Sequence, residues 1–223
     1  MTRLELRGDK VIESPEGPGL YAWYYRPIRT TKESILGTLT QLLSVQPTIS
    51  TKVSQRYGVR YISETYGKVV LGVDERSVVG AINDAFELAP LYLESLFESE
   101  QFVYFCRPIY IGIAKSLRER IYSQHYVALI DFWDENHRVG KFLQAHGQAT
   151  IQTVMDKLDL SHSFALEARV LGISPRDLMV SIFTTDKLPE SIGQDSDTTN
   201  DSTSRRALER LFQLLADPVC GRR

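Results

Sequence analysis

Residues 108–120 have the sequence PIYIGIAKSLRER, and this stretch decides how the chain folds. Its first half is rich in β-branched and aromatic residues, which predicts a strand that Gly112 interrupts. Its second half carries arginines at the start of a predicted helix. The stretch GLYAWYY at residues 19–25 predicts a partner strand, again with a tyrosine close after a glycine. Two strands with tyrosines beside a helix with arginine suit chemistry on a phosphodiester.

The length and composition of the chain limit its class. The 223 residues are enough for one domain, or for one domain with a sizeable insertion, and a hydrophobic content of 43% is enough for a packed core. No apolar run approaches the length of a membrane span, and the N-terminus lacks the apolar segment of a signal peptide. Cys106 and Cys220 lie far apart and next to no histidine cluster. We therefore expect no membrane, no disulfide framework and no zinc site, and a location in the reducing cytoplasm.

The charge balance argues against a protein that coats nucleic acid. Lys and Arg number 26 against 28 Asp and Glu, a net charge of −2, whereas nonspecific binding to phosphates usually requires a basic chain. A local basic cleft is still compatible with this balance. Residues 102–126 contain four basic side chains and one acidic side chain.

The pattern along the chain predicts alternating strands and helices. Strands are predicted at residues 20–25, 102–113 and 178–183, after a lead-in at 4–17 in which Val11 and Ile12 form a further strand candidate. Helices are predicted at residues 34–43, 74–97, 117–130, 140–149 and 151–158, the second broken at Pro90. Residues 53–73 resemble a hairpin, and the polar residues 193–204 predict a loop. A last helix has apolar side chains in helical spacing at Leu208, Leu211, Phe212 and Leu215 and ends at Pro218.

The start of the helix at residues 117–130 carries a capping signal. In the sequence SLRE, the Ser116 hydroxyl can accept a bond from a first-turn N–H, and Glu119 can reach back to the start of the helix. The helix therefore begins at Leu117.

Tyr21 and Tyr110 are the first candidates for chemistry. A phenol can position an attacking water, or relay its proton where a cation lowers the pKa from about 10. The ordinary alternative is a half-buried sheet tyrosine, of which a chain with eleven tyrosines has many. In that case the protein is an unrelated α+β domain.

Arg120 is the next candidate. One turn into a helix after a glycine turn, a guanidinium can bind two phosphate oxygens, although a solvated arginine is the default. Arg118 lies about 200° away around an α-helix, so the two cannot serve the same spot. Gln124 shares the face of Arg120, whereas His125 lies about 140° away and shares a face with Arg118 and Ile121.

Glu209 is the candidate metal ligand. It lies at the edge of the apolar stripe of the last helix, where a single carboxylate can hold Mg²⁺ together with several waters. An ordinary pair with Arg205 or Arg206 is the alternative. Glu167 is a weaker candidate because it precedes the third strand.

The order of these motifs resembles the GIY-YIG nuclease superfamily. Gly19-Leu20-Tyr21 is similar to the first signature of the family, and Tyr110-Ile111-Gly112 matches the second. Arg120 lies eight residues after Gly112, where the helix arginine of the family belongs. The third strand, Glu209 and Pro218 resemble the closing strand, the metal-binding glutamate and the terminal loop. The resemblance covers residues 17–27 and 103–223, and GLYAWYY and PIYIGIA look most like the restriction-endonuclease branch.

Two positions depart from the pattern of the family. Some relatives carry a histidine or tyrosine four residues after the arginine, where this chain has Gln124 followed by His125. The family usually has an asparagine about three residues after the final proline, where this chain has Gly221. The second departure keeps a different function open, namely a GIY-YIG-like module that binds nucleic acid or protein with weakened catalysis.

The resemblance implies a fold and a division of the chain. The fold is α+β, with a small three-stranded mixed sheet flanked by helices and a large insertion between the first two strands. Residues 1–29 and 103–223 form a discontinuous nuclease domain. Residues 30–102 form an inserted, mostly helical subdomain that includes the hairpin.

The resemblance also implies a metal-dependent DNA endonuclease that leaves 5′-phosphate and 3′-hydroxyl ends, with a role in restriction or another defence. Tyr21 or Tyr110 positions or deprotonates the water, and Arg120 holds the scissile phosphate. Glu209 binds one Mg²⁺ (or Mn²⁺), which stabilises the leaving oxygen. The partner is DNA, and a homodimer is one way to cut both strands. Further site residues are His125 in the catalytic group and Lys115, Arg118 and Gln124 in contact with DNA.

Overall fold

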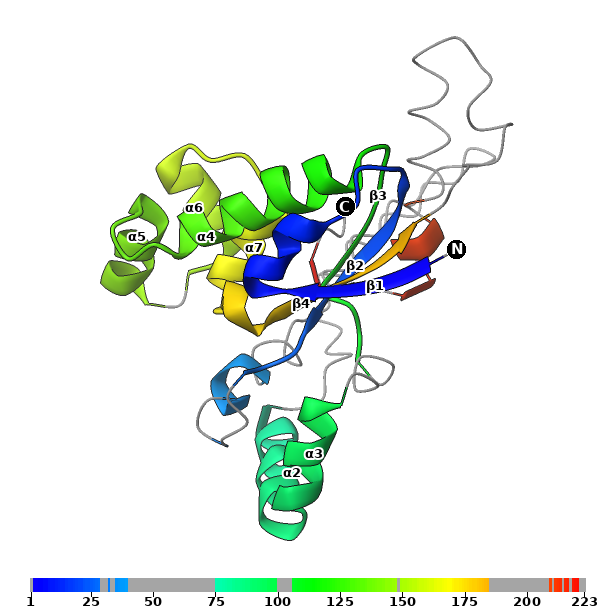
Figure 1. Cartoon of the computed structure of the whole chain (residues 1–223). Coiled ribbons are helices and arrows are strands. Elements are labelled where there is room, and N and C mark those ends of the chain that lie inside the picture. Colours follow the sequence, from blue (N-terminus) through cyan, green and yellow to red (C-terminus); the bar gives the residue numbers. More distant parts are fainter. Residues whose placement is uncertain are drawn as a thin grey trace, which may run out of the picture.

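A computed structural model of the chain shows an α+β fold built on one four-stranded sheet (Figure 1). The strand order is β1-β4-β2-β3, and every neighbouring pair is antiparallel. The structure describes residues 2–28, 32, 35–39, 75–99, 106–147, 149–184, 209, 211–213, 215, 216 and 218–220. The strands are β1 (Thr2–Arg7), β2 (Gly19–Tyr25), β3 (Tyr110–Ala114) and β4 (Leu178–Thr184).

The α+β class is confirmed, but the prediction of a three-stranded mixed sheet is wrong. The missed strand is β1, in which Leu4 and Leu6 alternate with charged residues, as in a strand with one buried face. We expected a lead-in here with a strand at Val11 and Ile12. Those residues lie instead in the short helix η1 (Gly8–Glu13), which Gly8 opens with a φ of 56°. Such a backbone suits glycine and ends the extended stretch.

In the sheet, β2 lies between the other two predicted strands, β3 and β4. It pairs with β3 on one side and with β4 on the other, so Tyr21 lies between Gly112 and Ile182. The inner part of this sheet is closely packed, and Trp23 has no exposed surface. The predicted strands at 20–25 and 178–183 are thus confirmed, while β3 is shorter than the predicted stretch from residue 102.

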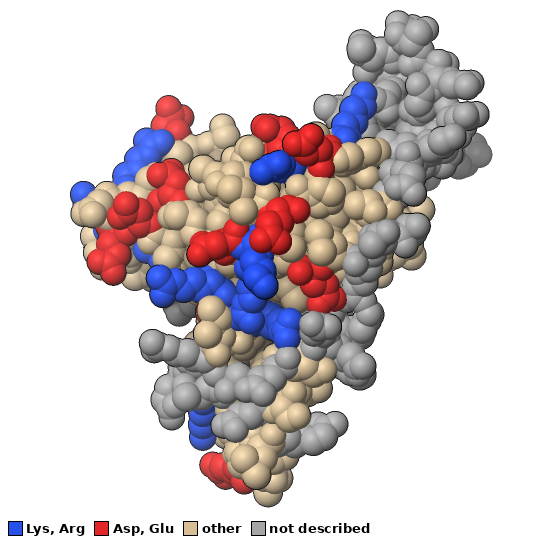
Figure 2. Space-filling view, viewed as in Figure 1, with Lys and Arg blue, Asp and Glu red and all other residues tan. Residues whose placement is uncertain are grey.

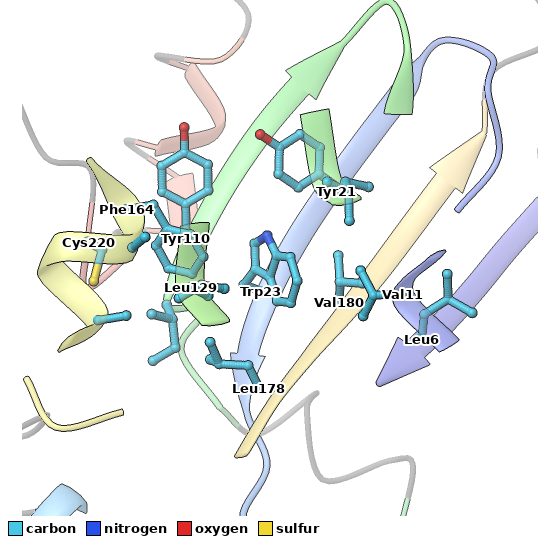
Figure 3. Close-up of a cluster of buried hydrophobic side chains, with 14 of the residues drawn as sticks. Leu6, Val11, Tyr21, Trp23, Tyr110, Leu129, Phe164, Leu178, Val180 and Cys220 are labelled. Atoms are coloured by element: carbon cyan, nitrogen blue, oxygen red, sulfur yellow. The ribbon is translucent and has the colours of Figure 1, made fainter. Parts of the chain in front are cut away.

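Helices cover the face of the sheet that carries Tyr21, Trp23 and Tyr110. The main core joins these residues to Leu129 of α4 and to Phe164 of α7 (Figure 3). Four helices lie together beside the sheet in Figure 1: α4 (Val127–Trp133), α5 (Arg138–His146), α6 (Ile151–Leu158) and α7 (Phe164–Val170). A smaller cluster of Val139, Val154 and Leu166 holds α5, α6 and α7 together.

The helix predicted at 117–130 begins as expected but differs in its middle. The Ser116 hydroxyl accepts a hydrogen bond from the Glu119 N–H at 3.4 Å, as the capping signal predicted. Residues 119–126 then form the π-helix η3 (Glu119–Tyr126), which continues into α4 up to Trp133. Helix α7 was not predicted, because its seven residues are too short for a clear apolar period.

The helices around the predicted insertion lie apart from this group. Helices α2 (Glu75–Leu88) and α3 (Pro90–Glu98) confirm the helical prediction at 74–97 and its break at Pro90, which is the first residue of α3. They lie beyond one end of the sheet in Figure 1. The predicted hairpin at 53–73 lies outside the described residues, and so does much of the helix at 34–43. The proposed division of the chain at residues 30 and 102 stays a prediction.

Helices of the described part are too short, or too polar, to cross a membrane.

Acidic and basic side chains lie next to one another on the face shown in Figure 2, in keeping with a net charge close to zero. The apolar stripe of the last helix is not fully covered, since Leu211 and Leu215 are exposed. A short helix η4 (Pro175–Asp177) leads into β4.

Candidate active site

Tyr21 and Tyr110 lie on neighbouring strands and face the same side of the sheet. Tyr110 is paired with Trp23, two residues after Tyr21, so the pleat puts all three side chains on one face. The two phenol rings are stacked with 6.2 Å between their centres. Their hydroxyl groups point away from the core toward a common region in Figure 3.

Gly112 makes room for the phenol of Tyr21. The two residues are direct partners across β2 and β3, and a Cβ at position 112 would come within 2.5 Å of Tyr21 Cζ. Such a contact is far inside van der Waals distance. The glycine of the YIG triplet is therefore required by the ring that crosses it, which is a reason that the sequence alone did not give.

The π-helix η3 brings His125 to Tyr21. The Nε2 atom of His125 lies 2.8 Å from the Tyr21 hydroxyl, and both side chains are buried. The expected α-helix would have put His125 about 140° from Arg120. In a π-helix each N–H bonds to the fifth carbonyl before it, as Val127 does to Tyr122, so the turns are wider and residues five apart lie closer around the helix than in an α-helix. His125 lies five residues after Arg120, one place later than the histidine or tyrosine of some relatives. The wider turn of the π-helix still brings it to Tyr21.

Arg120 is the second residue of η3 that lies close to the phenols, after His125. Its guanidinium lies close to the hydroxyls of Tyr21 and Tyr110 and interacts with both, and its Nη1 donates to Gln124 Oε1 at 2.5 Å. The Gln124 amide in turn donates to Glu119 at 3.5 Å. The guanidinium is thus held by Gln124 beside the two phenols before any substrate is present.

The protonation states follow from burial. Burial raises the pKa of Tyr21 well above its ordinary value, Tyr110 adds to this effect, and Arg120 opposes it. Burial likewise raises the pKa of Tyr110, with a further contribution from Glu209. Burial, followed by the charge of Arg120, lowers the pKa of His125 to about 3. All three rings are therefore neutral near pH 7.

The direction of the hydrogen bonds can be assigned from these states. A guanidinium only donates, so Arg120 cannot accept a phenol proton and leaves these protons for other acceptors. The Tyr21 hydroxyl therefore donates to Nε2 of neutral His125. This tautomer carries its own proton on Nδ1.

A pocket of about 370 Å³ opens beside these side chains. Its lining includes five residues predicted from the sequence, which are Tyr110, Arg120, Gln124, His125 and Glu209. The hydroxyl of Tyr21 reaches the same group through His125 and Arg120. Of the two phenols, the guanidinium and the carboxylate that the sequence interpretation placed in one pocket, Tyr110, Arg120 and Glu209 line it and Tyr21 lies behind it, and the roles of these residues stay predictions.

Lys115 and Arg118 do not belong to the lining of this pocket. Lys115 is exposed, and Arg118 forms an exposed ion pair with Glu16 at 3.3 Å. Contact with nucleic acid at these residues would require a substrate that extends beyond the pocket, and it stays a prediction.

Several lining residues escaped the sequence interpretation. They are His162, Ser163 and Phe164 at the start of α7, together with Gln213. Gln213 lies four residues after Glu209 on the last helix, so helical spacing would have found it. His162 had no such signal, because only the fold brings α7 against η3.

The donors in the pocket fit one divalent cation. Glu209 is the acidic residue of the lining, and the described residues contain no group of three or more His, Cys, Asp or Glu arranged as a closed metal site. Mg²⁺ is usually held by one or two carboxylates, with waters and substrate phosphate filling the other positions. One carboxylate beside a pocket is compatible with such a site.

Comparisons of the chain with protein-family models, with curated proteins and with solved structures gave no match. The functional interpretation therefore depends on the geometry of the pocket and on the resemblance of the motifs.

Proposed function

We propose that this protein is a metal-dependent endonuclease of the GIY-YIG type, which hydrolyses DNA to 5′-phosphate and 3′-hydroxyl ends. The observation that carries the proposal is the meeting of Tyr110, Arg120, His125 and Glu209 at one pocket, with the buried Tyr21 hydroxyl 2.8 Å from His125 Nε2 behind them. These residues come from β2, β3, η3 and the last helix. Residues of chemical importance that converge from distant segments on one pocket are typical of an active site.

Arg120 binds the scissile phosphate in this proposal. Its guanidinium lies in the pocket lining and is already held by the two phenols and Gln124. A preorganised guanidinium stabilises the charge that builds up on the phosphate oxygens in the transition state. Tyr110 lies beside it and donates a hydrogen bond to the same phosphate.

Tyr21 and His125 take up the proton of the attacking water. The water gives a proton to the Tyr21 oxygen, while the proton of the Tyr21 hydroxyl passes to Nε2 of His125. The resulting hydroxide forms the new P–O bond, and the bond to the 3′-oxygen breaks. Burial, followed by the charge of Arg120, lowers the pKa of His125, and a bound phosphate that offsets this charge makes His125 a better acceptor.

Glu209 would hold the Mg²⁺ or Mn²⁺ ion, together with waters and phosphate oxygens. When bound, the cation supplies charge neutralisation at the reacting phosphate.

DNA is the proposed substrate, and restriction or another defence role is the proposed context. The pocket offers one set of these residues per chain within the described part. To cut both strands, the protein must act twice or pair as a homodimer. Lys115, Arg118 and Gln124 are proposed to contact the DNA backbone around the cut.

A plasmid assay tests the proposal. Supercoiled plasmid is incubated with the protein in Mg²⁺ or in EDTA, and nicked circles are measured. We expect cutting in Mg²⁺ only, and a loss of at least about 100-fold in Arg120→Ala and in Glu209→Gln. The matched controls are Lys141→Ala and Glu13→Gln, exposed residues outside the pocket that should leave the rate unchanged.

Intact plasmid under all conditions would contradict the enzyme. If DNA were still retained in a binding assay, the result would support the alternative, a GIY-YIG-like module with weakened catalysis. The absence of the usual asparagine, where the chain has Gly221, is the observation that favours this alternative.

A further inference from the structure

A histidine and a glutamate at the start of α7 form a pair beside the proposed active site. His162 lines the same pocket as Arg120 and Glu209. Its Nε2 atom lies 3.1 Å from Oε1 of Glu167, and the two side chains are only 27% and 16% exposed. The motifs compared with the GIY-YIG signatures do not include this pair.

The backbone of Glu167 is held in helix α7. It belongs to the first turn of α7, where its N–H bonds to the Ser163 carbonyl at 3.0 Å. The buried thiol of Cys220, with 1% exposure, lies close to the Glu167 carboxylate. Burial, followed by the charge of Glu167, raises the pKa of Cys220 well above its ordinary value, so this thiol stays protonated. The carboxylate thus has a neutral neighbour in Cys220 and an imidazole 3.1 Å away in His162.

The contact with Glu167 orients His162. Nε2 of His162 lies at ion-pair distance from the Glu167 carboxylate, which is able to accept its hydrogen. Because Nε2 faces Glu167, Nδ1 is the ring nitrogen to which we assign contact with a group bound in the pocket. A carboxylate that holds one nitrogen of an imidazole while the other nitrogen acts on a substrate is a general arrangement for proton transfer. This explains Glu167 better than the metal ligation considered from the sequence.

We propose that His162, oriented by Glu167, is the general acid that protonates the leaving 3′-oxygen of the cleaved strand. This inference rests on the proposed endonuclease function. It assigns a proton donor at the opposite end of the reaction from Tyr21 and His125. His125 is held by Tyr21, so one histidine acts on the attacking water and another on the leaving group.

The step is balanced in protons and electrons. The attacking water loses one proton to Tyr21, and the remaining hydroxide forms the bond to phosphorus. The electron pair of the P–O3′ bond moves to the 3′-oxygen. This oxygen takes the proton from Nδ1 of the His162 imidazolium, which becomes neutral imidazole with its Nε2 hydrogen still directed at Glu167. Solvent restores the proton after the product leaves.

The test uses a substrate whose leaving group needs no proton. The linkage cut by the wild-type protein is first mapped on a defined duplex, and the duplex is then synthesised with sulfur in place of the 3′-oxygen at that linkage. A thiolate leaves as the anion far more readily than an alkoxide. Both duplexes are cleaved under single-turnover conditions in Mn²⁺ by wild type, His162→Gln, Glu167→Gln and His146→Gln. On each duplex, the wild-type rate is divided by the rate of the variant. This ratio cancels the change in metal binding that the sulfur causes, because that change is the same for all four proteins.

We expect His162→Gln to slow cleavage of the oxygen duplex by about 10²- to 10⁴-fold and that of the sulfur duplex by less than about threefold. Glu167→Gln should show the same preference for sulfur with a smaller loss. His146→Gln, in which the lost imidazole lies outside the pocket on α5, should match wild type on both duplexes.

Equal losses on the two duplexes would overturn the inference, because they would show a role in folding or binding. Full activity of His162→Gln on both duplexes would also overturn it. Thermal unfolding of each variant separates a folding defect from a chemical one. If the wild type cuts neither duplex, the endonuclease proposal itself fails, and this outcome differs from a wild type that cuts while its variants show no preference for sulfur.

Discussion

The space over Gly112 decides where the phenol of Tyr21 lies. Because the two residues are paired across β2 and β3, the ring crosses the position that a Cβ would occupy. This contact explains a glycine and a tyrosine that the sequence shows only as members of separate triplets. The triplets were predicted correctly as strands, but the contact between them depends on strand register, which local sequence does not fix.

Replacement of Gly112 by alanine tests this packing. We expect Gly112→Ala to lower the free energy of unfolding by about 1–3 kcal/mol, because the Tyr21 ring must move, and to reduce plasmid cleavage as the phenol leaves His125. Urea unfolding and the nicking assay measure the two effects. Gly17→Ala is the control, since a Cβ there meets no atom within 4 Å. Equal stability of the two variants would contradict the packing.

His125 should make stability depend on pH. The folded state lowers its pKa from 6.5 to about 3, so between these values the unfolded chain binds more protons. Stability is then fully present above pH 6.5 and is lost as the pH falls toward 3, by about 3 kcal/mol between pH 6.5 and pH 4. His125→Gln should remove this part of the slope in urea unfolding at several pH values. An unchanged slope in the variant would show that His125 is not buried in its neutral form, and His146→Gln should keep the slope of wild type.

The helix that carries Arg120 and His125 shows where element prediction succeeds and where it fails. The capping signal at Ser116 gave the start of the helix, because such a cap is made by residues three apart in the sequence. The π-helix η3 was not predicted, since apolar period does not distinguish one extra residue per turn from an α-helix. An α-helix would have placed His125 about 140° from Arg120, whereas the π-helix places it against Tyr21.

Removal of one residue from η3 tests this explanation. A π-helical turn is equivalent to one residue inserted into an α-helix, so deletion of the exposed Ser123 should restore an α-helix with the histidine four residues after Arg120. We expect the deletion variant to keep its fold and to cut plasmid within about tenfold of wild type. Circular dichroism and the nicking rate give the result.

Deletion of Lys141 in α5 is the matched control. Helix α5 is α-helical, so the deletion there should shift the buried Val139 relative to the residues after position 141 and lower stability. A Ser123 deletion that folds well but loses all cleavage would contradict the role given to the π-helix.

For the entire chain, the positions of the central strands were easier to predict than the number of strands and the direction in which they pair. The strands at 20–25 and 178–183 have strong β-branched and aromatic patterns, whereas β1 is short and half charged. The antiparallel order β1-β4-β2-β3 depends on long-range pairing, which no local pattern contains. Lining residues of the pocket from β3, η3 and the last helix were named from the sequence, and those of α7 were missed, because only tertiary packing places His162 there.

The number of active sites per chain should be visible in the kinetics. One pocket with this set of residues lies in the described part of a chain, so a monomer cuts one strand at each encounter. We expect nicked circles to appear before linear plasmid, and linear product to rise with the square of protein concentration if two chains must pair. A gel time course at several concentrations measures both. Linear product without a nicked intermediate, at a rate proportional to protein concentration, would contradict this expectation.

The cooperation of distant residues at one phosphate is best measured by a double-mutant cycle on Arg120 and Glu209. Single-turnover cleavage in Mg²⁺ is compared for wild type, Arg120→Ala, Glu209→Gln and the double variant, with thermal unfolding as the control for folding. Residues that act together on one transition state give strongly non-additive losses. We predict that the double variant is no more than about tenfold slower than the slower single variant. Losses that multiply in full, or single variants that cut as fast as wild type, would contradict a shared active site.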